Sequence, residues 1–235
     1  MRSLVMKAVS GVLIVIAAGQ LRAETIWNVA DDFSATDNPN GPWSYGISLT
    51  LGGSFLIDDT PLSSGLDSWL YQGNGNYAHL AHNGTADTYY EGSGVTLPAN
   101  GVCLHPGRGG DFAVIRWTAP LAALISIKGG FTGQDTTGGS TDVHVLHNGE
   151  TSVFDGTVSG YGPGSGPDFS IDLSVSVGDT LDFVVGCGTG SWWDDTTGLV
   201  ARITAVPEPS TIALVGVGCV ALYGFSRLRR QSKLR

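Results

Sequence analysis

Cysteine is scarce in this sequence: its 235 residues include three, Cys103, Cys187 and Cys219. None belongs to a Cys-x-x-Cys pair, which excludes a zinc knuckle and a thioredoxin-type redox motif. Cys219 lies in an apolar run near the C-terminus, so Cys103 and Cys187 are left as the candidates for a disulfide bond in an oxidising compartment. The sequence gives no distance between these two thiols and leaves the bond open.

Catalytic motifs are also missing. No Gly-x-Ser-x-Gly elbow, His-Glu-x-x-His helix, Walker loop or Gly-x-Gly-x-x-Gly fingerprint occurs. The five histidines are scattered along the chain, and only His79 and His82 have a spacing that a turn or short helix could turn into a metal site. The plainer interpretation places both on an exposed loop, and we expect His144 and His147 to face solvent on either side of a hairpin. The sequence therefore predicts no catalysis.

Basic residues are rare between residues 24 and 205. This stretch holds four of the 12 Lys and Arg residues but 20 of the 21 Asp and Glu residues, which gives it a formal charge of −16. Nucleic acid binding needs clustered basic side chains, so nucleic acid is excluded as a partner. Cations, cationic polymers and neutral glycans remain compatible with this charge.

The N-terminus has the three parts of a Sec signal peptide. Arg2 and Lys7 are basic, residues 8–18 form a short apolar run, and Ala23 ends a small or apolar stretch that suits cleavage. The run is too short for a transmembrane helix. We therefore expect residues 1–23 to be a signal peptide and the chain to be exported.

The C-terminus also has three parts, within residues 206–235. Val206, Pro207, Glu208 and Pro209 are followed by an uncharged run at 210–225 and then by a basic cluster that includes Arg227, Arg229 and Arg230. An uncharged run satisfies its backbone in lipid only as a helix, and the basic cluster holds the end of the chain on the cytoplasmic side. Sixteen residues are short for a lasting span, which favours a transient anchor.

This tail resembles the PEP-CTERM sorting signal of Gram-negative bacteria. The resemblance implies export, recognition by a membrane exosortase at the Pro-Glu-Pro motif, and cleavage near it. It further implies an inner-membrane intermediate and a final place in the cell envelope, on the outer surface or in the extracellular matrix. Many members belong to exopolysaccharide or biofilm systems.

Short apolar-alternating runs dominate residues 24–205. The clearest is 169–177, where every second residue is apolar, so that one face of the strand is buried. Asn148-Gly149 predicts a tight hairpin, and Gly178-Asp179 a turn. Further strands are expected at 47–51, 54–57, 69–71, 113–117, 124–128, 143–146, 151–154, 181–185 and 199–204. The sequence predicts an all-β, antiparallel, jelly-roll-like sandwich, with a β-helix as the alternative.

Two pairs of end segments, 32–34 with 38–46 and 177–186 with 195–199, resemble exported ectodomains of the same sorting class. Those ectodomains are similar to jelly-roll carbohydrate-binding modules. The resemblance implies a β-sandwich of the kind found in carbohydrate-binding modules. It does not identify a substrate.

Aromatic pairs are the first candidate ligand contacts. Aromatics at i and i+2 of a strand share a face, so we expect Trp43, Trp69 and Trp117 to fill the core. Trp192 and Trp193 are adjacent and would point to opposite sides of an extended strand, which leaves one exposed. This pair is therefore the best candidate for stacking on a sugar ring.

Acidic pairs are the second candidate: Asp31/Asp32, Asp58/Asp59 and Asp194/Asp195. Calcium takes six or more oxygen ligands, and Asp194 and Asp195 could supply some of them in a loop as a structural Ca²⁺ site. A solvated acidic loop is the simpler interpretation.

Taken together, the sequence predicts an exported, non-catalytic envelope or matrix protein whose leading specific role is glycan binding. The alternatives are a polysaccharide-active enzyme, a purely structural matrix protein and, more remotely, an ice-binding protein. An enzyme requires a groove with two carboxylates or a His/Tyr pair.

Overall fold

The computed structural model describes residues 24–63, 65–71 and 78–206, and all their regular elements are β-strands. The predicted signal peptide, the predicted 210–225 helix and the basic cluster lie outside the described residues, so they stay predictions. Within the described residues, no helix has the length and apolar character needed to cross a membrane.

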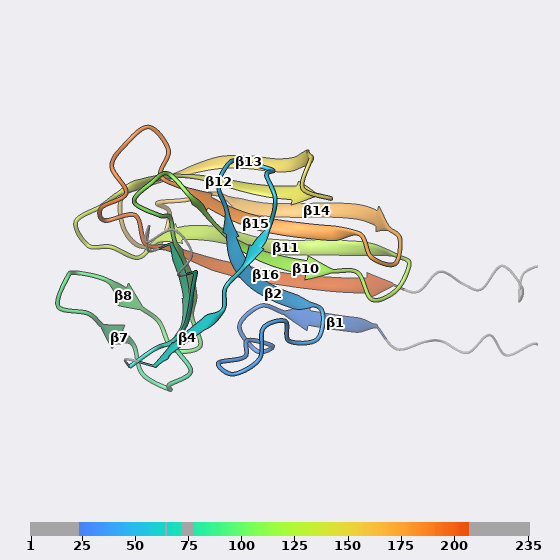
Figure 1. Ribbon diagram of the computed structural model, residues 1–235, viewed down its shortest axis with the longest axis horizontal. Coiled ribbons are helices and arrows are strands. Elements are labelled where there is room, and N and C mark those ends of the chain that lie inside the picture. Colours follow the sequence, from blue (N-terminus) through green and yellow to red (C-terminus); the bar gives the residue numbers. More distant parts are fainter. Residues whose placement is uncertain (1–23, 64, 72–77, 207–235) are drawn as a thin grey trace, which may run out of the picture. The chain divides into compact units, whose positions relative to one another are not determined.

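Two antiparallel sheets make up the domain (Figure 1). One follows the strand order β14 (Asp168–Val175), β11 (Ala123–Gly133), β16 (Thr197–Val206), β9 (Val102–His105), β6 (His79–His82), β5 (Asp67–Leu70) and β4 (Thr60–Ser63), with β1 (Thr25–Asn28) also paired to β16. The other follows β13 (Thr151–Ser159), β12 (Ser140–His147), β15 (Thr180–Gly186), β10 (Phe112–Thr118), β2 (Trp43–Ser48) and β3 (Leu56–Ile57). A small hairpin joins β7 (Tyr89–Tyr90) and β8 (Thr96–Leu97).

One apolar core draws on both sheets. It contains Ile127 and Ile203 from the first sheet and Ile115 and Phe183 from the second, all fully buried. Because inward and outward side chains alternate along each strand, this shared core shows that the sheets pack face to face. The predicted all-β sandwich is confirmed.

The expected core tryptophans are buried. Trp43 and Trp117 are directly opposite each other on β2 and β10 and are 0% exposed, and Trp69 on β5 is 4% exposed. Trp27 packs its ring against Trp117 edge to face, with 5.1 Å between the centroids. The indoles thus occupy the interior at the end of the sandwich where β1 and β2 begin.

The predicted turns form as expected. Asn148 and Gly149 both have positive φ, 55° and 70°, in the connection between β12 and β13, and Gly178 has φ 89° between β14 and β15. Positive φ at two central residues matches the twist of a tight hairpin. Each predicted strand overlaps an observed one, whereas β1, β4, β6, β7, β8 and β9 were not predicted.

The disulfide left open by the sequence is not formed: Cys103 and Cys187 are both free thiols. Cys103 on β9 packs with Ala81 and Leu97 in a small cluster, apart from the core that receives its neighbours Val102 and Leu104. Its side chain therefore points away from the second sheet. Cys187 directly follows β15, a strand of that second sheet, so the two thiols are held apart.

Candidate functional site

The connection between β15 and β16 carries Trp192 and Trp193 on a bend and turn rather than on a strand. Asp194 completes the turn with φ 65°, a left-handed conformation that Asp tolerates better than most residues. The two indoles consequently lie on the same side and stack, with centroids 4.1 Å apart and planes 30° from parallel. Opposite sides were expected only for an extended chain, and the chain turns here; one of the two indoles, Trp193, is exposed as expected.

Four rings form a row that starts at this turn. Trp193 is 64% exposed, and Trp192 beneath it is half-buried. Trp192 meets His105 of β9 edge to face at 5.9 Å, and His105 stacks on His79 of β6 at 5.0 Å with planes 9° apart. His79 and His105 are cross-strand partners, so the sheet itself sets their spacing. We call Trp193, Trp192, His105 and His79 the aromatic row.

His105 keeps the row uncharged near its buried end. Burial, together with the neighbouring His79, lowers the pKa of His105 to about 4. The His105 Nδ1 lies 2.8 Å from the Pro106 carbonyl, and because a carbonyl only accepts, Nδ1 carries the proton. The row therefore ends in one broad exposed indole that is supported from beneath by flat rings.

Asp194 and Asp195 follow the indoles but do not gather a metal site. Within the described residues, no group of three or more His, Cys, Asp or Glu side chains is placed to hold a metal ion. Asp195 is buried and accepts a hydrogen bond from the Ser140 backbone N–H at 3.1 Å, while its Oδ2 is buried without a partner. Burial, with a smaller contribution from the Asp194 charge, raises the pKa of Asp195 to about 7. This carboxyl behaves as a structural acceptor.

The histidines that the sequence grouped are separated by the fold. His79 and His82 lie on β6 three residues apart, which places them on opposite faces of the sheet, so they do not form a pair. His82 instead stacks on Phe33 at 5.0 Å. The expectation that His144 faces solvent is wrong: its ring is buried between Asp142 and Asp155, at 3.0 and 2.6 Å. Asp142 of β12 and Asp155 of β13 each contact one nitrogen of the ring.

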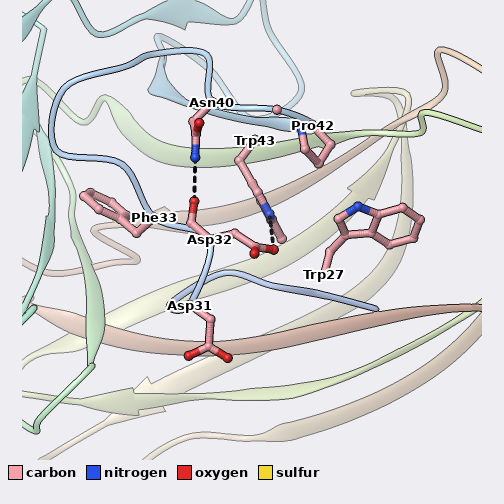
Figure 2. Close-up of a pocket in the computed structure, with 8 residues that line it drawn as sticks. Trp27, Asp31, Asp32, Phe33, Asn40, Pro42 and Trp43 are labelled. Atoms are coloured by element: carbon pink, nitrogen blue, oxygen red, sulfur yellow. Dashed lines mark hydrogen bonds between the residues drawn. The ribbon is translucent and has the colours of Figure 1, made fainter. Parts of the chain in front are cut away.

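A second candidate site, which the sequence did not predict, is a pocket of about 360 Å³ beside β1 and β2 (Figure 2). Side chains from 27–33 and 40–43 line it, including Trp27, Asp31, Asp32 and Phe33. The Asp31/Asp32 pair is visible in the sequence as one of three acidic pairs, but the pattern favours Asp194/Asp195 as the candidate calcium loop. The sequence does not show which aromatic side chains join these acids, because the loop between β1 and β2 brings them together.

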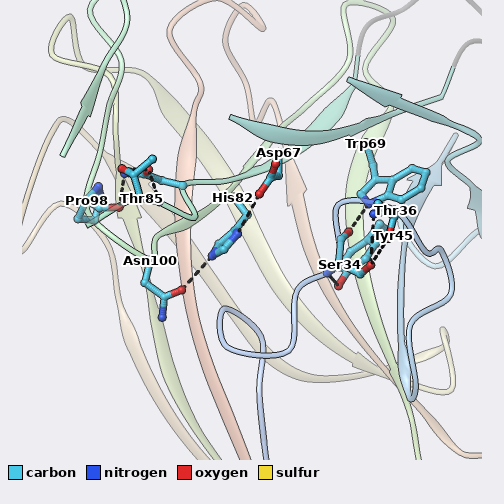
Figure 3. Close-up of polar contacts among 10 residues, drawn as sticks. Ser34, Thr36, Tyr45, Asp67, Trp69, His82, Thr85, Pro98 and Asn100 are labelled. Atoms are coloured by element: carbon cyan, nitrogen blue, oxygen red, sulfur yellow. Dashed lines mark hydrogen bonds and ion pairs between the residues drawn. The ribbon is translucent and has the colours of Figure 1, made fainter. Parts of the chain in front are cut away.

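A series of side-chain hydrogen bonds supports one carboxylate on the lining of this pocket. Figure 3 shows Asp67, His82 and Asn100 in sequence, with His82 Nε2 at 2.9 Å from Asn100 Oδ1. Asn100 in turn donates from Nδ2 to Asp31 Oδ1 at 2.8 Å. A line of polar side chains from β5 and β6 thus ends at a pocket carboxylate.

Comparison with known protein families gives a match for the C-terminal part of the chain. Residues 205–230 match the family model of the PEP-CTERM protein-sorting motif. The chain therefore carries this sorting motif, which marks it as an exported protein sorted by an exosortase. The matched residues include the Pro-Glu-Pro triplet, and nearly all of them lie outside the described part of the structure.

Several solved structures that the chain resembles are carbohydrate-binding modules. One is CBM51 from Clostridium perfringens GH95 in complex with methyl-galactose (15% identity, TM-score 0.37, 76% of this chain and 99% of that one). Another is a family 35 carbohydrate-binding module from Clostridium thermocellum (9% identity, TM-score 0.29, 79% and 99%). These TM-scores are too low to support an argument about the ligand. No curated protein matches the chain.

Proposed function

We propose that this exported domain is a non-catalytic glycan-binding protein and that Trp193, stacked on Trp192, is its sugar-contacting platform. The observation that carries the proposal is the exposure of Trp193. Its side chain is 64% exposed, whereas Trp43, Trp69 and Trp117 are at most 4% exposed. The exposed Trp193 ring stacked on Trp192 presents a flat apolar face that a ligand can cover.

The geometry of the row suits a sugar ring. A pyranose presents a flat face of C–H groups, which stacks on an indole without the need for a deep pocket. Trp192 and His105 hold Trp193 from beneath, so little side-chain freedom is lost on binding. Asp194, next to the platform, offers a carboxylate that can accept hydrogen bonds from sugar hydroxyls.

The sorting signal supplies the place of action. We propose that the exosortase removes the basic tail and that the domain then acts in the envelope or extracellular matrix of a Gram-negative bacterium, where extracellular polysaccharide is the partner. Mass spectrometry of the native protein is expected to find residues 227–235 missing. An intact C-terminus in a host that carries an exosortase would refute processing.

Glycan binding is tested by screening the full chain against a polysaccharide array, with and without calcium. We expect binding to at least one neutral glycan and a loss of about tenfold in affinity in Trp193→Ala, because removing one well-placed aromatic contact costs roughly 1.5 kcal/mol. Tyr90→Ala is the matched control, since Tyr90 is an aromatic side chain that is 72% exposed and lies on the separate β7–β8 hairpin.

Two outcomes count against the proposal. Failure to bind any polysaccharide in either condition refutes the glycan-binding role. Equal losses in Trp193→Ala and Tyr90→Ala would refute the platform, because they would show that any exposed ring serves.

A further inference from the structure

The pocket beside β1 and β2 combines aromatic rings with two adjacent acids. Trp27 and Phe33 are half-buried on its lining, and Asp31 and Asp32 lie between them in the chain (Figure 2). Trp43 also borders the pocket but is 0% exposed, so it supports the wall and does not touch a ligand. A volume of about 360 Å³ matches the lower end of the range for small-ligand sites.

Each carboxylate is oriented by donors of the protein. Asp32 Oδ2 accepts from Trp43 Nε1–H at 3.1 Å and from the Asn28 backbone N–H at 2.9 Å. Asp31 Oδ1 accepts from Asn100 Nδ2 at 2.8 Å. Since the Asn100 amide nitrogen is used on Asp31, its oxygen must accept from His82, whose Nε2 therefore carries a proton. Such fixed acceptors lose little freedom when a ligand arrives.

In the part of the chain that the structure describes, no cation pairs with Asp31 or Asp32. Among the described residues, neither Asp31 nor Asp32 takes part in an ion pair, and the four basic residues between 24 and 205 are Arg108, Arg116, Lys128 and Arg202. Arg116 is committed to Asp182 through two hydrogen bonds of 2.6 and 2.8 Å. The field of a domain at −16 also draws cations toward its surface.

We propose that this pocket is a second ligand site, separate from the aromatic row, and that it binds a hexosamine unit through its protonated primary amine. The ammonium group lies against Asp31 and Asp32, where the ring of Trp27 adds cation–π attraction. The sugar ring covers the apolar lining. A polysaccharide with free amino groups is the class of polymer that presents such units.

A sugar is favoured over a lysine side chain by the shape of the lining. The Trp27 indole beside the acids provides flat apolar area, which suits the C–H face of a sugar ring. A lysine stem is narrow and mobile and would leave much of a 360 Å³ pocket unfilled. Acetylation of the amine removes its charge and thus its main attraction to the carboxylates.

The test uses the full chain and three probes: glucosamine, N-acetylglucosamine and Nα-acetyl-lysine amide. Binding is followed by NMR of the Trp27 indole N–H and by calorimetry. We expect glucosamine to bind about tenfold more tightly than N-acetylglucosamine, since a hydrogen bond to a charged group contributes roughly 1.5–3 kcal/mol. Added salt is expected to weaken glucosamine binding and to leave N-acetylglucosamine binding unchanged.

Asp31→Asn provides the matched variant, because Asp31 is exposed and the change keeps its size while removing its charge. We expect glucosamine affinity to fall about tenfold in this variant. The control, Asp172→Asn, removes the same charge from an exposed position on β14 and is expected to leave the affinity unchanged. Circular dichroism checks that both variants fold.

Three results would overturn the proposal: equal affinity for glucosamine and its N-acetyl form, equal losses in Asp31→Asn and Asp172→Asn, or tighter binding of the lysine derivative. The last would assign the pocket to basic peptides instead. Trp193→Ala is expected to leave glucosamine binding intact, so failure of this site and failure of the proposed platform are distinguishable.

Discussion

Two tryptophan pairs in this domain have opposite surroundings. Trp43 and Trp117 face each other across β2 and β10 and are fully buried, whereas Trp192 and Trp193 stack on a turn that leaves Trp193 64% exposed. Residue type is the same, and backbone conformation makes the difference. A strand of alternating pattern turns an indole into the core, and a turn with a left-handed Asp194 lifts it out.

This contrast separates stability from binding. The core pair contributes buried apolar area to the sandwich, while the turn pair adds little to folding and is available to a ligand. The same division holds among the acids: Asp58 is buried and its neighbour Asp59 is exposed. Substitution of a buried member is expected to change stability more than substitution of its exposed counterpart. Equal effects would contradict the comparison.

The largest effect is expected in Trp43→Ala. Loss of a buried indole leaves a cavity and removes one of the two hydrogen bonds to Asp32 Oδ2, so the free energy of unfolding should fall by about 3–5 kcal/mol. Trp193→Ala should change it by less than about 0.5 kcal/mol. Denaturant unfolding of both variants measures this, and a Trp193 variant as unstable as the Trp43 variant would contradict the contrast.

Asp58 is expected to make stability depend on pH. Both of its carboxyl oxygens are buried without a hydrogen-bond partner, and burial, with some help from Asp59, raises its pKa from 3.8 to about 8. The folded state thus holds a proton that the unfolded state releases near pH 4. The contribution of Asp58 to the free energy of unfolding is fully present below pH 4. It is lost as the pH rises to 8, by no more than about 1.4 kcal/mol per pH unit.

Urea unfolding between pH 4 and 8 checks this prediction. Asp58→Asn is expected to flatten the pH profile, whereas Asp59→Asn, one residue away and exposed, should leave the slope nearly unchanged. A profile that is equally steep in wild type and Asp58→Asn would show that the buried carboxyl is not the cause.

A smaller effect is expected from His144. Burial lowers the pKa of this imidazole, but hydrogen bonds to Asp142 and Asp155 more than offset it, so the pKa lies above 6.5. Its stabilisation is complete below pH 6.5 and is lost as pH rises through the raised pKa. Because Asp155 is largely exposed, we expect about 0.5 kcal/mol. His144→Gln in the Asp58→Asn background should remove this step, and an unchanged step would contradict it.

Much of the fold was predictable because most long strands alternate cleanly. Segment 169–177 showed its buried face in the sequence, and Asn148-Gly149 its turn. Strands β6 and β9 were missed because they are short and are covered on both sides at Ala81 and Cys103, which removes the alternation. Sandwich architecture follows from local pattern, whereas these central strands depend on what packs over them.

The candidate sites were only half predictable. The Trp192-Trp193 pair stands out in the sequence, yet its stacking depends on the φ of Asp194 and on His105 beneath it. The pocket draws Asp31 and Asn100 together from positions 69 residues apart. No local pattern encodes such a long-range contact, and the Asp31/Asp32 pair alone names no ligand.

The most direct test of the central claim is an NMR titration that follows the six tryptophan indole N–H signals while a glycan found on the array is added to the full chain. The account predicts that the signals of Trp192 and Trp193 shift with ligand concentration and that those of Trp43 and Trp117 do not. Movement of the core signals with a silent Trp193 would contradict the account.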